Sequence, residues 1–174
     1  VRHSDRPQAL RLRVDDAPIT FHDAIQGDCG QNLASEVGDF VIRRTDGYFA
    51  YQLAVVVDDA DQGITHIVRG SDLLDSTARQ IYLQQLLDFP ALKYAHLPIA
   101  VDQYGYKLSK QTGAEPINAD HPGLALWSAL RFLGQEAPPE LVHALPAEII
   151  AWALTHWRLT KVPTIAHFCA AQLD

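Results

Sequence analysis

The sequence predicts an α/β fold with a parallel sheet, followed by a small α-helical region. Residues 63–70 (GITHIVRG) and 97–101 (LPIAV) have the apolar, β-branched composition of buried strands, and an amphipathic helical pattern occupies residues 75–88 between them. Strand, helix and strand in that order indicate a βαβ crossover, which joins parallel strands. From residue 122 onward, apolar residues recur at helical spacing instead, which predicts the helical region.

Composition limits the class of protein. The chain has 174 residues, a net charge of −7 and 48% hydrophobic residues, which is typical of a globular protein without strong non-specific affinity for nucleic acid. No apolar run is long enough to span a membrane, and the first residues do not resemble a signal peptide. Cys29 and Cys169 lie far apart, which argues against a disulfide framework or zinc ribbon and favours the cytoplasm.

The first 38 residues have weak patterns. Residues 10–14 alternate apolar and basic side chains and predict a half-exposed strand, and residues 19–23 predict a second one after a turn. Residues 27–32 are interpreted as a loop because they contain two glycines and an asparagine. Cys29 has no base beside it in the sequence, so we expect a passive thiol.

The next segment predicts a hairpin. Residues 39–44 (DFVIRR) have strand composition, Asp46-Gly47 favours a tight turn, and residues 48–51 are expected to form the returning side. Residues 52–59 fit either a strand or a short buried helix. The carboxylates at 58, 59 and 61 fit a metal site, an acid/base pair or, as the plainest interpretation, a solvated turn.

Arg69 is the first candidate site residue. It ends the predicted strand 63–70, and ligands of parallel sheets bind beyond the carboxyl ends of strands, where a guanidinium can hold a carboxylate with two hydrogen bonds. Asp75 and the two residues after it are expected to cap the following helix, which ends before Pro90.

Lys107 and Lys110 are the second candidate. They lie three residues apart in the segment KLSK, after the strand 97–101 and between Gly105 and Gly113. Two ammonium groups suit a polyphosphate and could stabilise the charge on departing pyrophosphate. Two solvated lysines in a surface loop would have the same spacing, so the segment alone leaves both interpretations open.

The last third of the chain is predicted to be helical. Residues 111–121 have a linker composition, residues 122–133 predict a helix that stops at Gly134, and prolines at 138, 139 and 146 open two further helices. Trp152 and Trp157 are expected in the core.

Three blocks of residues together resemble the second half of the class I glutamyl-type aminoacyl-tRNA synthetases. They are residues 39–44, 49–59 and 62–70, and residues 107–111 (KLSKQ) are similar to the KMSKS loop of that class. The similarity covers roughly residues 39–111. It implies a Rossmann-type parallel sheet, with residues 1–111 as the second half of the catalytic domain and residues 112–174 as a helical region of the kind that contacts the tRNA stem.

The resemblance also implies an activity. The nearest branch of the family is a truncated paralogue that activates L-glutamate with ATP and attaches it to the queuosine base of tRNA(Asp). By resemblance, Tyr51 and Arg69 bind L-glutamate, Lys110 contacts ATP with support from Lys107, and residues 52–59 are helical. We expect a monomer.

The resemblance leaves part of the family pattern unmatched. The first Rossmann half and the Zn²⁺ site of the family are expected before Val1. We therefore expect no metal site within this chain. We therefore expect the chain to be part of a longer or two-piece enzyme and to be inactive by itself. A conventional glutamyl-tRNA synthetase fragment and a non-catalytic binding module that keeps the fold are the alternatives.

Overall fold

The computed structural model describes residues 8–109, 116–164 and 167–169. The chain forms two compact units, one of residues 1–23, 27–68 and 73–95 and the other of residues 24–26, 69–72 and 96–174. Within the described ranges, no helix has the length and apolar character needed to cross a membrane. The division into compact units follows packing, so the functional boundary at residues 111 and 112 stays a prediction.

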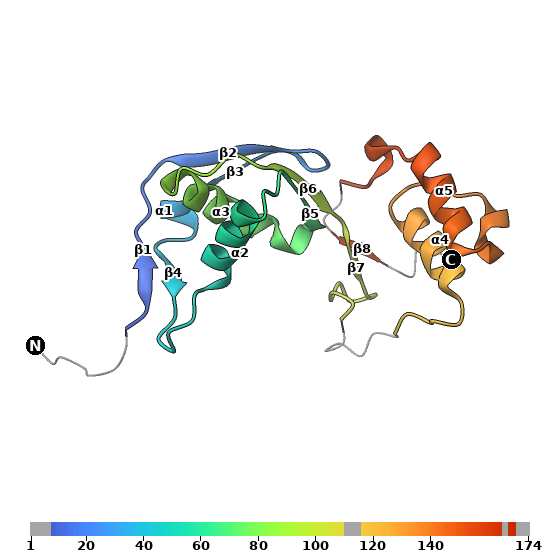
Figure 1. Cartoon of the computed structure of the whole chain (residues 1–174), viewed down its shortest axis with the longest axis horizontal. Helices are drawn as coiled ribbons and strands as arrows, with labels where there is room; N and C mark the ends of the chain where they lie inside the picture. Colours follow the sequence, from blue (N-terminus) through green and yellow to red (C-terminus); the bar gives the residue numbers. More distant parts are fainter. Residues whose placement is uncertain (1–7, 110–115, 165–166, 170–174) are drawn as a thin grey trace, which may run out of the picture. The chain divides into compact units, whose positions relative to one another are not determined.

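The elements are shown in Figure 1. Those up to the sixth strand are β1 (Leu10–Leu12), β2 (Pro18–Asp23), β3 (Gly27–Asn32), α1 (Leu33–Glu36), β4 (Phe40–Arg43), α2 (Tyr51–Asp61), β5 (His66–Gly70), the 3₁₀ helix η1 (Ser71–Leu73), α3 (Leu74–Leu86) and β6 (Lys93–Leu97). Those that follow are β7 (Ile99–Val101), α4 (Pro122–Phe132), the 3₁₀ helix η3 (Pro139–His143), α5 (Pro146–His156), the 3₁₀ helix η4 (Leu159–Lys161) and β8 (His167–Cys169).

A four-stranded sheet organises the first half of the chain. Its strand order is β3-β2-β6-β5, so β5 is an edge strand. β2 pairs antiparallel with β3 and parallel with β6, and α3 connects β5 to its neighbour β6. β1 and β4 form a separate antiparallel pair. The α/β class with parallel strand pairing is therefore confirmed.

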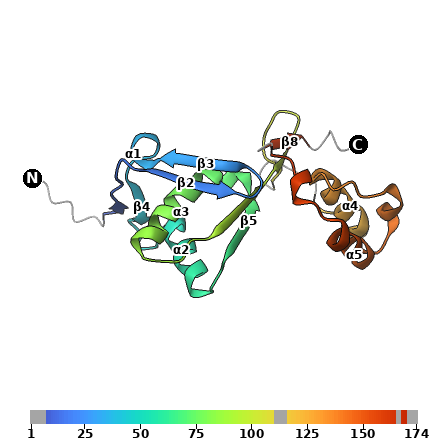
Figure 2. The ribbon, with the colours of Figure 1, turned by 90° about the horizontal axis from the view of Figure 1, so that it is seen from above.

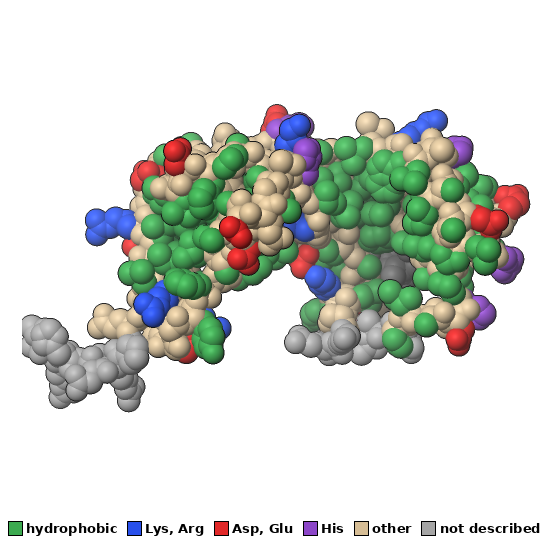
Figure 3. Space-filling model, viewed as in Figure 1, with side chains coloured by type: hydrophobic (Ala, Val, Ile, Leu, Met, Phe, Trp, Pro, Cys, Tyr) green, Lys and Arg blue, Asp and Glu red, His purple; other side chains and the backbone are tan. Residues whose placement is uncertain are grey.

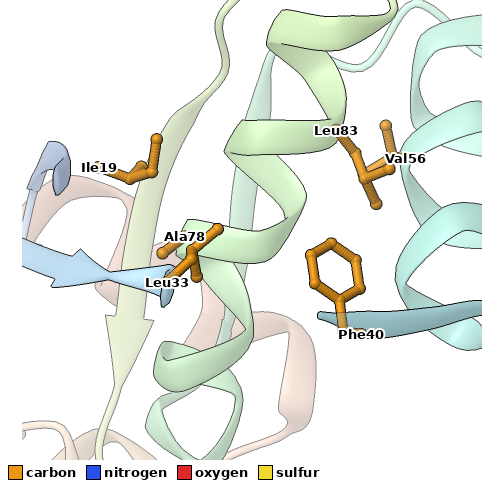
Figure 4. Close-up of a cluster of buried hydrophobic side chains, with 6 residues drawn as sticks. All are labelled: Ile19, Leu33, Phe40, Val56, Ala78 and Leu83. Carbon is orange, nitrogen blue, oxygen red and sulfur yellow. The ribbon is translucent and has the colours of Figure 1, made fainter. Parts of the chain in front are cut away.

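Two helices cover one face of this sheet (Figure 2). α3 packs against β2, and α2 packs against α3. The core between them consists of buried apolar side chains from strands and helices (Figure 4), namely Ile19, Leu33, Phe40, Val56, Ala78 and Leu83. Val56 is only 1% exposed, and this burial explains why the valine-rich segment folds as an amphipathic helix in spite of its strand propensity.

The second unit contains a parallel pair and the predicted helices. β7 and β8 pair in parallel, with Ile99 opposite His167. α4 and α5 enclose a small core in which Ile149 is fully buried. Figure 3 shows hydrophobic side chains at the surface of this unit. The large exposed hydrophobic residues of α5 and its N-cap are Leu145, Ile150 and Leu154.

The loop expected at residues 27–32 is wrong, because these residues form β3. All six are paired with β2, from Pro18 opposite Asn32 to Asp23 opposite Gly27. The hairpin partner β2 supplies main-chain hydrogen bonds to alternate residues of β3, and those bonds outweigh the low strand propensity of glycine and aspartate.

The hairpin at residues 39–51 is only partly as expected. The turn forms with Gly47 at φ 90°, as Asp-Gly predicts. The strand expected at residues 48–51 is wrong. Only a single bridge between Arg43 and Phe49 forms there among the described residues, because α2 already begins at Tyr51. Residues 52–59 are helical, as the resemblance implied, so the solvated turn expected at the three aspartates is the end of α2 instead.

Two further expectations fail around α3. The helix begins at Leu74 and its N-cap residue is Leu73, so the cap expected from Asp75 is wrong; the preceding 3₁₀ turn leads directly into the helix. The single strand expected at 97–101 is two strands, β6 and β7, because Pro98 has no N–H to donate to a ladder.

Both tryptophans were expected in the core, and this prediction is confirmed for one of them. Trp152 is partly buried and packs against the core of the second unit. Trp157 is 41% exposed, so its assignment to the core is wrong. α5 ends at His156, and the next residue therefore leaves the apolar face of the helix.

Candidate functional site

The candidate site begins at the end of β5. Arg69 is the penultimate residue of this strand and is partly buried. Gly70 ends the strand, and the chain turns at once into η1, where Ser71 is buried and Asp72 is more exposed. The strand thus ends in a cation followed three residues later by an anion.

The Arg69 guanidinium is held from within the protein. Its Nε donates a hydrogen bond to Nε2 of His96 at 3.0 Å. His96 is fully buried near the end of β6, and its main-chain oxygen accepts a hydrogen bond of 2.8 Å from the Gln26 side chain. The orientation of Arg69 is therefore set by a side chain that is itself fixed.

The KLSK segment, residues 107–110, begins in ordered structure. The Asp102 carboxylate accepts hydrogen bonds of 2.9 Å from the amides of Tyr104 and Tyr106, and Gly105 supplies the positive φ of 84° that this tight turn requires. Lys107 forms an antiparallel bridge with Val101, the last residue of β7. After β7 the chain thus passes through a defined turn and returns to the strand at Lys107, where the KLSK segment begins.

Lys107 is joined to η1 by an ion pair. Its Nζ lies 2.5 Å from Oδ2 of Asp72, three residues after Arg69 in the chain. Gly70 makes room for this carboxylate, because a Cβ at position 70 would overlap Oδ1 of Asp72 and lie 3.1 Å from Cγ2 of Ile99. The end of β5 and the start of the KLSK segment are therefore connected by a specific contact within the second unit.

The other predicted site residues are placed as follows. Lys110 lies outside the described residues. Tyr51 is the first residue of α2 in the first unit, and its side chain is about half exposed at 52%. The structure thus brings Lys107 to the segment that follows Arg69, and the roles of Tyr51 and Lys110 stay predictions.

Cys29 has the properties of a passive thiol. It lies on β3 and is partly buried. Burial raises the pKa of the Cys29 thiol, and the negative charges of Asp23 and Asp28 raise it further. A raised pKa leaves little reactive thiolate at neutral pH.

The described residues hold no metal cluster, and one cavity of the second unit is lined by residues other than Arg69 and Lys107. In the described part of the chain, no group of three or more His, Cys, Asp or Glu is arranged to hold a metal ion. A cavity of about 420 Å³ lies at the beginnings of α4 and α5, lined by residues such as His121 and His143. Arg69 and Lys107 do not line it.

Reasoning from sequence missed His96, Asp72 and Gln26. His96 contacts Arg69, Asp72 contacts Lys107 and Gln26 contacts His96, and each pair lies far apart in the sequence and matches no motif. One usable signal existed for Asp72, because a carboxylate two residues after a strand-ending glycine is well placed to turn back over that glycine. No comparable signal pointed to His96, whose contact depends on how β5 and β6 pair.

Comparison with known proteins gives the family to which this arrangement is similar. The model for "tRNA synthetases class I (E and Q), catalytic domain" matches residues 1–142. Among solved structures, the crystal structure of glutamate-tRNA synthetase from Elizabethkingia anophelis is similar with a TM-score of 0.68 and 26% identity, over 96% of this chain and 38% of that one.

Curated proteins are more similar still. A glutamyl-Q tRNA(Asp) synthetase from Ectopseudomonas mendocina is 50% identical over 98% of this chain, and one from Aromatoleum aromaticum is 59% identical over 89%. The chain covers 58% and 49% of these two relatives. It therefore spans about half the length of the curated relatives it matches.

Proposed function

Because the chain belongs to the class I tRNA synthetases of the E and Q type, we propose that it is part of a ligase that activates L-glutamate with ATP and attaches it to the queuosine base of tRNA(Asp). The observation that carries the proposal is the end of β5. There Arg69 is oriented by His96, and the next turn holds Lys107 of the KLSK segment through Asp72. The relatives named glutamyl-Q tRNA(Asp) synthetase, at 50–59% identity, support this branch of the family.

Arg69 serves as the receptor for the side-chain carboxylate of glutamate. A guanidinium is always charged and presents parallel N–H donors that match the two oxygens of a carboxylate. Since the anchored Nε sets the plane of the guanidinium, the ligand meets a fixed rather than a freely rotating group. Tyr51 is proposed to contact the same substrate, on the family resemblance.

Lys107 and Lys110 serve the first chemical step. An oxygen of the glutamate α-carboxylate attacks the α-phosphorus of ATP, the bond from that phosphorus to the bridging oxygen breaks, and pyrophosphate leaves. Positive charge beside the departing pyrophosphate stabilises the transition state more than the ground state. Lys110 supplies this charge directly, and Lys107 holds the start of the segment in place.

The second step transfers the glutamyl group. A nucleophilic group of the queuosine base attacks the carbonyl carbon of the glutamyl adenylate, and AMP leaves. The conventional alternative is transfer to the terminal ribose of a tRNA. The two alternatives differ in the acceptor alone, so product analysis separates them.

The test uses the full-length enzyme that contains this chain. Glutamate-dependent ATP–pyrophosphate exchange is expected, and Lys110→Ala should lower its kcat by about 10²–10³-fold, as for loss of one group that stabilises transition-state charge. With radiolabelled glutamate, nuclease digestion of the charged tRNA(Asp) should place the label on the fragment that contains the queuosine base and leave the 3′-terminal nucleoside unlabelled.

Three results would count against the proposal. Label on the terminal ribose would identify a conventional synthetase. Unchanged exchange in Lys110→Ala would remove the lysine from the chemistry. Absence of exchange in the full-length protein, together with retained binding of tRNA, would indicate a binding module.

A further inference from the structure

A buried histidine fixes the side chain that we assign to glutamate. His96 is 0% exposed, and its Nε2 lies 3.0 Å from Nε of Arg69. We propose that His96 is the positioning residue for Arg69 and thereby a determinant of amino-acid specificity, an inference that rests on the proposed function of Arg69.

The chemistry of the two groups fixes the protonation state of the ring. Arginine nitrogens only donate hydrogen bonds, so Nε2 of His96 must accept. An accepting Nε2 carries no hydrogen, which makes the imidazole neutral with its hydrogen on Nδ1. An imidazolium would present a second donor to Arg69 and repel its charge.

The histidine can orient the arginine because it is held more firmly than the arginine itself. It lies on a strand, it has no contact with solvent, and its main-chain oxygen is bound by Gln26 at 2.8 Å. Arg69 is a long, partly exposed side chain, and loss of the bond at Nε makes more rotamers available to its guanidinium. Substrate would then have to select the binding-competent one, which weakens binding in proportion to its population.

Specificity follows from the same anchor. A fixed guanidinium favours a carboxylate, whose two oxygens both accept, over an amide, which presents one acceptor and two donors. A guanidinium that can turn away loses this discrimination. Displacement of Arg69 should therefore weaken glutamate binding and reduce the preference for glutamate over glutamine, while ATP binding stays unchanged.

The experiment compares His96→Phe, His96→Gln and Arg69→Lys in the full-length enzyme by ATP–pyrophosphate exchange. His96→Phe keeps a ring of similar size without an acceptor, and His96→Gln restores an acceptor oxygen. We expect His96→Phe to raise the KM for glutamate about 10-fold or more and to reduce the glutamate-to-glutamine ratio of kcat/KM, with the KM for ATP within about 2-fold. His96→Gln should recover most of both losses.

Arg69→Lys separates this inference from the function on which it rests. If that variant leaves the KM for glutamate unchanged, the assignment of Arg69 to glutamate fails. If Arg69→Lys raises this KM while His96→Phe matches the wild type, the positioning role is overturned and the proposed function stands. A His96→Phe enzyme in which the KM values for glutamate and ATP rise together would show a general structural role and also overturn it.

A spectroscopic measurement decides the case in which His96→Phe does not fold. In wild-type enzyme with ¹⁵N-labelled histidine, the Nε2 of His96 should have the chemical shift of an unprotonated ring nitrogen, and that shift should change in Arg69→Lys. A protonated Nε2, or a shift indifferent to Arg69→Lys, would contradict the proposed contact.

Discussion

Gly134 shows how one residue can be required for two reasons. It follows α4 with a φ of 70°, and an added Cβ would overlap the carbonyl oxygen of Lys161. Gly105 has a similar φ of 84°, but no atom of the described residues lies within 4 Å of its missing Cβ. Substitutions at Gly134 and Gly105 therefore differ in one respect. Both strain the backbone, but only the one at Gly134 also creates steric overlap with a main-chain atom.

We predict that Gly134→Ala lowers the free energy of unfolding by about 3 kcal/mol and Gly105→Ala by about 1 kcal/mol. Denaturant unfolding of the purified variants measures both. Equal losses would mean that the carbonyl of Lys161 moves without penalty and that only the φ angle matters.

The Cys29 thiol gives a prediction on pH. Because burial and two nearby carboxylates raise its pKa, the thiolate is scarce at neutral pH and becomes abundant only at higher pH than in an unfolded chain. The contribution of this group to stability is present below the unfolded pKa and is lost as the pH rises through the folded pKa. Alkylation of Cys29 by iodoacetamide, followed by peptide mapping, should have a higher pH midpoint in native than in denatured protein. The same midpoint in both states would contradict this prediction.

At the scale of elements, the contact between η1 and the KLSK segment is specific but weak. Lys107 and Asp72 side chains are 52% and 33% exposed, and solvent screens ion pairs of that exposure. A double-mutant cycle with Asp72→Asn and Lys107→Met should give a coupling of about 0.2–1 kcal/mol in the free energy of unfolding.

The salt dependence of the coupling energy serves as the control for this cycle. At about 1 M salt the Debye length falls to about 3 Å, so the coupling should shrink further. A coupling well above 1 kcal/mol that is insensitive to salt would show that the pair is shielded from solvent and carries more of the structure than its exposure indicates.

Elements with a repeating pattern were predictable, and elements defined by their partners were not. β5, α3, α4 and α5 follow from apolar periodicity, which the local sequence contains. β3 depends on pairing with β2, and its polar residues carry no strand signal. The helical state of α2 came from the family resemblance, because its valines favour a strand when taken alone.

The candidate site was predictable to a similar extent. Arg69 and Lys107 were identified because a strand end and a two-lysine motif are visible in sequence. Their partners, His96 and Asp72, belong to other segments and became recognisable only when strand pairing and the turn at Gly70 were known. Sequence therefore located the charged groups, whereas the structure was needed to find what orients them.

At the scale of the whole molecule, each compact unit has a core of its own. Leu33 is 1% exposed in the core of the first unit, and Ile149 is 0% exposed in that of the second. Leu33→Ala and Ile149→Ala should each lower the free energy of unfolding by about 2–5 kcal/mol. Because the two core clusters have no member in common among the residues that the structure describes, the loss in the double variant should equal the sum of the two single losses within about 0.5 kcal/mol by denaturant unfolding. A larger deviation would reveal energetic coupling between the cores.

The parallel pairing of β7 with β8 also affects the order of events during synthesis. Ile99 and His167 are 68 residues apart in the chain, and everything between them must leave the ribosome before the ladder can close. β7, the strand before the KLSK segment, therefore gains its partner β8 only after α4 and α5 have been synthesised. Its amides on that side should be the last to gain protection from hydrogen exchange in a growing chain.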